Sequence, residues 1–210
     1  MTTVTHRPDV SEPLLCLSFD DGPGPQTPAI LDVLAEHGAR GTFFVLGESI
    51  EGREEILART IAEGHEIGNH TFSHPHALDL EEPELEHDIA RCQRLLTAAE
   101  PALFRPPYGE DALRCSRVAA RRGLPVTALW SIDPRDFAER DPDAIADVIE
   151  REAAAGAIVD LHDGFPRVTS TDRDRTPTVQ ALERAVPRLV ERGFRLVTIS
   201  ELLAAPAAGG

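Results

Sequence analysis

Two adjacent aspartates, Asp20 and Asp21, follow the apolar run 14–19 and precede a Gly-Pro-Gly sequence. A short apolar run that ends at glycine and proline is typical of a buried strand entering a turn. Neighbouring carboxylates that lose water at such a strand end repel each other, and a bound metal cation is the simplest compensation. A solvated acidic turn is the alternative, and other residues of the chain must decide between the two.

His70 and His74 stand four residues apart. On a helical turn this spacing puts two imidazoles on one face, where they can share a metal ion. Together with Asp21 they make a set of three N and O ligands, which leaves positions open for water and substrate as in a catalytic zinc site. The same ligand types serve non-haem iron oxygenases, and a surface histidine cluster is the alternative without a metal.

Four further side chains could supply acid–base chemistry, which favours hydrolysis over oxygenation. Asp20 can take a proton from an attacking water, and His162 can protonate a leaving group. Arg105 can orient a carboxylate by a two-pronged contact. Asp136 can hold His162 in one tautomer and raise its pKa. Each side chain alone also fits a structural role, but each follows an apolar run.

Apolar runs alternate with amphipathic stretches along the chain, which predicts βα units around a parallel sheet. Expected strands are 14–19, 41–46, 65–68, 126–130, 157–161 and 194–199, with a weak one around 103–104. Expected helices are 27–37, 50–63, 82–99, 111–122, 143–154 and 177–192. About seven such units favour a closed or nearly closed barrel over an open sheet, with the active site at the carboxyl ends of the strands.

The composition limits the class of protein. A chain of 210 residues predicts one domain, with its core at about 14–203. The net charge of −15 argues against a nucleic-acid partner or an anionic membrane. No lysine is present, which excludes lysine Schiff-base chemistry, and no glycine-rich nucleotide motif follows a strand. Three cysteines without metal-site spacing predict reduced thiols, and the absence of a signal-peptide pattern at 1–10 predicts a cytoplasmic location.

Five segments in chain order resemble the motifs of the polysaccharide deacetylases of the NodB-homology type, carbohydrate esterase family four. They are Ser-Phe-Asp-Asp-Gly at 18–22, His-Thr-Phe-Ser-His at 70–74, Arg-Pro-Pro-Tyr-Gly at 105–109, Asp-Pro-Arg-Asp-Phe at 133–137 and Leu-His at 161–162. The resemblance covers residues 14–203. Ser18 stands where the family has threonine, and Phe137 stands where it has tryptophan, which changes a wall of the expected acetyl pocket.

This resemblance implies a distorted (β/α)7 barrel of parallel strands and one divalent metal ion, usually Zn²⁺, with Co²⁺ or Ni²⁺ as substitutes. It implies Asp21, His70 and His74 as ligands. It further implies Asp20 as the base, oriented by Arg105, and His162 as the acid, tuned by Asp136. The implied substrate contacts are the backbone N–H of Tyr108 at the oxyanion, Leu161 at the acetyl methyl, and the side chains of Trp130 and Phe137.

The predicted function is metal-dependent hydrolysis of an N-acetyl group on an amino sugar of an oligosaccharide, a polysaccharide or a glycosylated metabolite. One alternative is a cytosolic hydrolase of a small amide, either a secondary-metabolite intermediate or a ring amide as in allantoinase-like members. A non-catalytic sugar-binding barrel is the alternative of another class. The expected partner is an N-acetylated sugar, with no nucleic acid and no membrane. Specificity is expected in loops 71–82, 110–114 and 165–176, the last a polar lip.

Overall fold

The computed structural model describes residues 1–167 and 174–208. Its centre is an eight-stranded sheet in the order β1-β6-β5-β4-β3-β2-β7, with β8 paired to β2. All neighbouring strands are parallel. The strands are β1 Thr2–Val4, β2 Leu14–Asp20, β3 Gly41–Val45, β4 Glu66–Asn69, β5 Leu103–Phe104, β6 Val126–Ala128, β7 Ile158–His162 and β8 Arg195–Leu196. Beyond β6, Ile132 forms a parallel bridge with Val159 of β7, so the sheet curls into a half-barrel.

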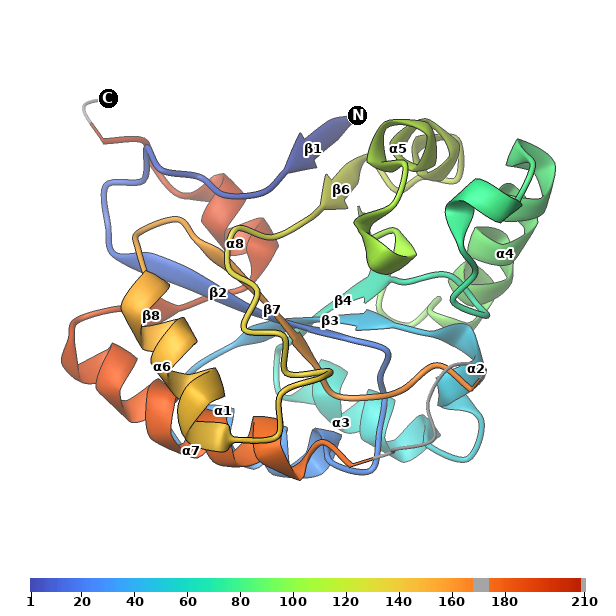
Figure 1. Ribbon diagram of the computed structural model, residues 1–210. Coiled ribbons are helices and arrows are strands. Elements are labelled where there is room, and N and C mark those ends of the chain that lie inside the picture. The colour runs from blue at the N-terminus through green and yellow to red at the C-terminus, as the bar shows by residue number, and fades with distance from the viewer. Residues whose placement is uncertain (168–173, 209–210) are drawn as a thin grey trace.

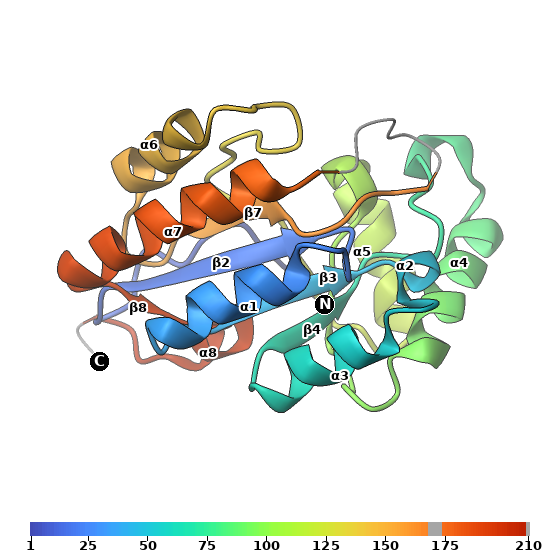
Figure 2. The ribbon, with the colours of Figure 1, turned by 90° about the horizontal axis from the view of Figure 1, so that it is seen from below.

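Each strand from β2 to β8 is followed by a helix, which gives the predicted series of βα units (Figure 1). The α-helices are α1 Thr27–Glu36, α2 Gly47–Ile50, α3 Glu54–Ala62, α4 Glu82–Leu95, α5 Ala112–Arg121, α6 Pro142–Glu152, α7 Thr176–Glu191 and α8 Ile199–Ala204. Figure 2 shows α6, α7, α1 and α3 side by side over one face of the sheet. The prediction of an α/β fold with parallel strands is confirmed.

Three of the differences from the predicted elements stand out, and two of them have a local reason. The expected helix 50–63 is split into α2 and α3, because Gly52 lies between them with a left-handed φ of 75°. The expected strand 194–199 pairs only at 195–196, since Thr198 opens α8 in a capping box with Glu201. Strand β1 was not predicted, and it pairs with β6 at the sheet edge.

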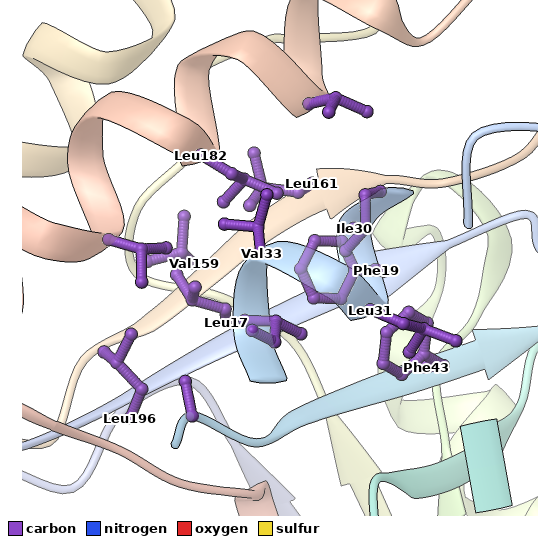
Figure 3. Close-up of a cluster of buried hydrophobic side chains, with 14 of the residues drawn as sticks. Leu17, Phe19, Ile30, Leu31, Val33, Phe43, Val159, Leu161, Leu182 and Leu196 are labelled. Carbon is purple, nitrogen blue, oxygen red and sulfur yellow. The ribbon is translucent and has the colours of Figure 1, made fainter. Parts of the chain in front are cut away.

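The outer face of the sheet buries the larger hydrophobic core. In Figure 3, Phe19 of β2 lies close to Ile30 of α1, and Leu17 and Leu31 belong to the same cluster. Alternate residues of a strand point to opposite faces of the sheet. The residues of β2 on either side of Leu17 and Phe19 therefore point to the inner face.

The inner face changes from apolar to polar along the strands. Leu14 and Cys16 of β2 belong to a second apolar cluster with Ile158 of β7. Farther along the same face come Ser18, opposite Asp160, and then Asp20, opposite His162. The carboxyl ends of β2 and β7 therefore present buried polar groups to one another, and the candidate site forms there.

In the described part of the chain, no helix has both the length and the apolar character needed to cross a membrane. Cys16, Cys92 and Cys115 are free and buried, in agreement with the prediction of structural thiols.

Candidate active site

A cavity of about 390 Å³ opens at the carboxyl ends of the strands. Its lining residues are Asp20, Asp21, His70, His74, Tyr108, Trp130, Asp133, Phe137, Asp160, His162, Pro166 and Arg175. Most of the site residues expected from the sequence thus meet in one cavity. Of the others, Arg105 and Asp136 are buried beside it and bonded to its lining residues.

Asp21, His70 and His74 form the candidate metal centre. Asp21 Oδ1 lies 3.6 Å from His70 Nε2 and 3.3 Å from His74 Nε2, and the three residues offer ligand atoms that lie within 4.8 Å of one another. This buried carboxylate oxygen has no hydrogen-bond partner, which is costly unless a cation occupies the cluster. The three side chains therefore fit a bound divalent metal ion.

Both histidines are in the neutral form that a metal ligand requires. His70 Nδ1 lies 2.8 Å from the backbone oxygen of Arg105, so Nδ1–H donates there and Nε2 is left for the cluster. Burial lowers the pKa of His70, and it lowers the pKa of His74 to about 4. Neutral imidazoles are the form that binds a metal.

The segment that carries the two histidines is a loop and not the helical turn that their spacing predicted. Thr71 and His74 have left-handed φ angles of 73° and 55°. Asn69 Oδ1 accepts from the backbone N–H of Thr71 at 2.8 Å. Asp88 of α4 accepts from the N–H groups of Phe72 and Ser73 at 2.9 and 3.0 Å. These bonds hold an unusual backbone that brings both rings to Asp21.

Arg105 is fully buried and holds Asp20. Its Nη1 donates to Asp20 Oδ1 at 2.8 Å and to Asp160 Oδ1 at 2.9 Å. Asp20 Oδ2 lies 3.5 Å from His70 Nε2, so one carboxylate oxygen is fixed by the guanidinium while the other faces the metal cluster. A base held in this way is oriented toward whatever the metal centre binds.

His162 and Asp136 form a second oriented pair. Asp136 Oδ1 lies 2.8 Å from His162 Nδ1, and Asp136 Oδ2 accepts from the backbone N–H of His162 at 2.9 Å and from Thr178 Oγ1 at 2.7 Å. Burial disfavours a charged imidazole here, but the Asp136 carboxylate outweighs it and raises the pKa of His162 to about 10. His162 is therefore protonated at neutral pH, which a general acid requires.

Replacing Asp136 with asparagine should shift the alkaline limb of the pH–rate profile to lower pH. The reason is that burial would remain while the carboxylate that stabilises the His162 imidazolium is lost. The wild-type pair also contributes stability below about pH 6.5, which is lost as the pH rises through about 10. Measurement of kcat/KM from pH 6 to 11 checks this role, and an unchanged alkaline limb would contradict it.

Aromatic rings form the outer walls of the cavity. Tyr108 lies edge-on to His74 at 4.5 Å between ring centroids and is stacked on His76 at 4.0 Å. Phe137 contacts the His162 ring edge-on at 5.4 Å. Tyr108 and Phe137 are exposed, at 42% and 44%, so both offer ring faces to a ligand that enters from solvent.

Leu161 does not line the cavity, and this corrects the expectation that it contacts an acetyl methyl. Its side chain is fully buried in the core on the outer face of the sheet, close to Leu182 of α7 (Figure 3). Asp160 lines the cavity in its place. The sequence could have indicated Asp160, because side chains two positions apart along a strand lie on the same face. If His162 faces the cavity, Asp160 must face it too.

The Leu161→Ala variant should lose about 2–5 kcal/mol of unfolding free energy, because it leaves a cavity in a packed core. We expect the KM of the folded protein for substrate to stay within about twofold, since the side chain is remote from the binding cavity. Denaturant unfolding and steady-state kinetics check the two parts. A large rise in KM without loss of stability would show that Leu161 lines the binding cavity after all.

Arg175, just before α7, is a further cavity residue that no sequence motif indicated. It is buried and donates to the backbone oxygens of Gly164 at 3.1 Å and Asp136 at 3.4 Å. The predicted polar lip 165–176 contributes Pro166 and Arg175 to the cavity, and its residues 168–173 lie outside the described residues.

Comparisons with known proteins agree with this geometry. A sequence profile described as polysaccharide deacetylase matches residues 7–127. A peptidoglycan-N-acetylglucosamine deacetylase of Bacillus cereus is 38% identical over 95% of this chain and 92% of its own length. A chitooligosaccharide deacetylase of Sinorhizobium fredii is 39% identical over 90% of this chain and 91% of its own length.

Among solved structures, a peptidoglycan N-acetylglucosamine deacetylase in complex with 4-naphthalen-1-yl-N-oxidanyl-benzamide superposes with a TM-score of 0.85. It is 30% identical, and the match covers 99% of this chain and 94% of that one. The similarity thus extends over the half-barrel and its cavity in both sequence and structure. The chain belongs to the polysaccharide deacetylase family.

Proposed function

We propose that this protein is a metal-dependent N-deacetylase that removes the acetyl group from an amino sugar and releases a free amine and acetate. One observation carries the proposal. A single cavity holds the cluster of Asp21, His70 and His74, in which one buried carboxylate oxygen has no hydrogen-bond partner. The same cavity holds a base and an acid, Asp20 and His162, and each is oriented by its own buried partner. The similar proteins, which act on chitooligosaccharide or on peptidoglycan N-acetylglucosamine, support this substrate class.

Asp21, His70 and His74 would hold the metal ion. Their mixture of one carboxylate and two imidazoles suits Zn²⁺, with Co²⁺ or Ni²⁺ as substitutes. Burial raises the pKa of Asp21 and of Asp160, and it raises the pKa of the nearby Asp163 to about 7. Burial disfavours the charged form of these carboxyl groups, and a divalent cation bound beside them would stabilise it. When bound, the metal would polarise the amide carbonyl and acidify water.

The proton transfers belong to the protein's own side chains. Asp20, oriented by Arg105, takes the proton of the attacking water. His162, charged through Asp136, gives a proton to the departing nitrogen, so that a neutral amine leaves. The backbone N–H of Tyr108 is our proposed donor to the oxyanion, since fixed donors aimed at developing charge stabilise it.

The cavity walls favour a sugar over other amides. Trp130, Tyr108 and Phe137 offer apolar ring surface around the titratable groups, and a sugar ring packs its C–H face on such rings. A non-catalytic sugar-binding role would leave unexplained why both the base and the acid have dedicated buried partners. We therefore favour the amino-sugar deacetylase over a small-amide hydrolase or a binding barrel.

Incubation of the Zn²⁺-loaded protein with N-acetylated chitooligosaccharides, peptidoglycan fragments, N-acetylglucosamine and a ring amide tests the proposal. We expect amine and acetate in equal amounts from an N-acetylated sugar, and none from the ring amide. Turnover of the ring amide alone, or no acetate from any sugar, would contradict the assignment.

A further inference from the structure

The floor of the cavity carries a polar carboxyl group where an acetyl-binding site would need apolar surface. Asp160 is paired with Ser18 of β2, and His162, two positions farther along β7, is paired with Asp20. Asp160 therefore lies deeper in the half-barrel than His162. It is 4% exposed and lines the cavity. Its Oδ1 accepts from Arg105 Nη1 at 2.9 Å, so the carboxylate is fixed in place.

Asp160 is not needed to hold Arg105. The Arg105 Nε donates to the backbone oxygen of Ala128 at 3.0 Å, and Nη2 donates to Ser18 Oγ at 2.9 Å and to Leu129 O at 3.2 Å. With Asp20 as a further acceptor, the guanidinium keeps its position without Asp160. A separate reason must account for this second buried acid.

Asp160, Asp20 and His162 also form a cluster with the spacing of metal ligands. A second cation is disfavoured there, because the guanidinium of Arg105 already occupies one oxygen of each carboxylate. The charged His162 adds further repulsion. Asp160 thus remains as a hydrogen-bond acceptor that faces the cavity.

The orientation of the substrate in the cavity determines which of its groups contacts Asp160. The carbonyl carbon that reacts between Asp20 and His162 carries two substituents, the sugar nitrogen and the acyl tail. The sugar is the larger of the two and must stay toward the opening, so the acyl tail points to the floor. Asp160 is the carboxyl side chain at that depth on β7.

An acetyl methyl and a carboxylate are a poor match, because the methyl displaces water from the carboxylate without offering a donor. An acyl tail with a hydroxyl on its α carbon restores the hydrogen bond that the carboxylate loses. Sites built around a buried acceptor discriminate against analogues that lack the donor.

We propose that Asp160 determines acyl specificity and that the enzyme removes an N-glycolyl group from an amino sugar in preference to an N-acetyl group. This inference rests on the proposed hydrolysis of an N-acyl amino sugar and changes only the acyl group that is preferred, from acetyl to glycolyl. The reaction is the same hydrolysis: water adds its oxygen to the carbonyl carbon, the C–N bond breaks, and the products are the sugar amine and glycolate. Asp20 takes a proton from the water, and His162 supplies one to the nitrogen.

The test compares N-glycolyl and N-acetyl forms of one chitooligosaccharide with the Zn²⁺-loaded enzyme, with release of the sugar amine as the readout for both. We expect the wild-type kcat/KM to be at least about tenfold higher for the N-glycolyl form, the effect of one hydrogen bond to a charged acceptor. Asp160→Leu, which keeps the branching at Cγ but replaces both oxygens with larger methyl groups, should bring this ratio below one. Asp160→Asn, which keeps an acceptor oxygen, should retain part of the preference.

Asp133→Asn is the matched control, because Asp133 also lines the cavity but is exposed at its rim. It should leave the ratio of the two substrates as in the wild type. Equal or better wild-type turnover of the N-acetyl form would overturn the inference while leaving the deacylase function intact. An unchanged ratio in Asp160→Asn and Asp160→Leu would also overturn it. If Asp160→Leu does not fold, the wild-type ratio and Asp160→Asn decide the question. Release of amine from neither substrate would overturn both the inference and the function on which it rests.

Discussion

The Asp20→Asn variant should lose about a thousandfold or more in kcat on an N-acetylated sugar. The amide has nearly the same shape as the carboxylate, and its oxygen can still accept from Arg105 Nη1. It cannot accept the proton of the attacking water, so the loss falls on the chemical step. Release of amine over hours, with active-site concentration known, measures a loss of this size.

Metal affinity is the control for this variant. Asp20 is next to Asp21 in sequence, but the cluster that fits the metal consists of Asp21, His70 and His74. We expect the variant to bind one equivalent of Zn²⁺ with affinity within about tenfold of the wild type. Undiminished turnover would show that Asp20 is not the base. A loss of metal binding in parallel with the loss of activity would show that Asp20 is a metal ligand.

The His162→Ala variant should lose about a hundredfold to ten-thousandfold in kcat on the same sugar. An amine leaves an amide only after protonation, and His162 carries the proton because Asp136 raises its pKa to about 10. The loss should be smaller on 4-nitrophenyl acetate, since its aryl oxide leaves without a proton.

The two substrates separate the two roles. Asp20→Asn should be impaired on both the amide and the activated ester, because both require a base for water. His162→Ala should be impaired chiefly on the amide. Equal losses of His162→Ala on the two substrates would mean that the histidine does not act as the proton donor.

The residues that meet in the cavity could be predicted largely from their position after apolar runs. Asp20 and His162 lie at the carboxyl ends of neighbouring strands, so a parallel sheet brings them together once the strands are recognised. The pairing of Asp136 with His162 could be expected from the residue types. The pairing of Arg105 with Asp20 in particular came only from the family resemblance, because a sequence does not give distances between strand ends.

The prediction for Leu161 failed where two signals disagreed. A motif of neighbouring residues indicated Leu161 beside His162, whereas the alternation along β7 indicates Asp160. The ligand loop could not be predicted for another reason. Its left-handed residues Thr71 and His74 depend on acceptors from Asn69 and from the distant Asp88. The bond from Asn69 is local, but the contacts with Asp88 join separate elements and leave no local pattern in the chain.

Activity as a function of bound metal tests the central claim most directly. Protein stripped by a chelator, with its metal content checked by elemental analysis, is titrated with Zn²⁺ while release of the sugar amine is followed. We expect less than about 1% of full activity without metal. It should rise linearly to a plateau at one equivalent, with no rise in a His70→Ala, His74→Ala double variant. Full turnover by metal-free protein, or an equal response of the double variant, would contradict the assignment of the metal centre.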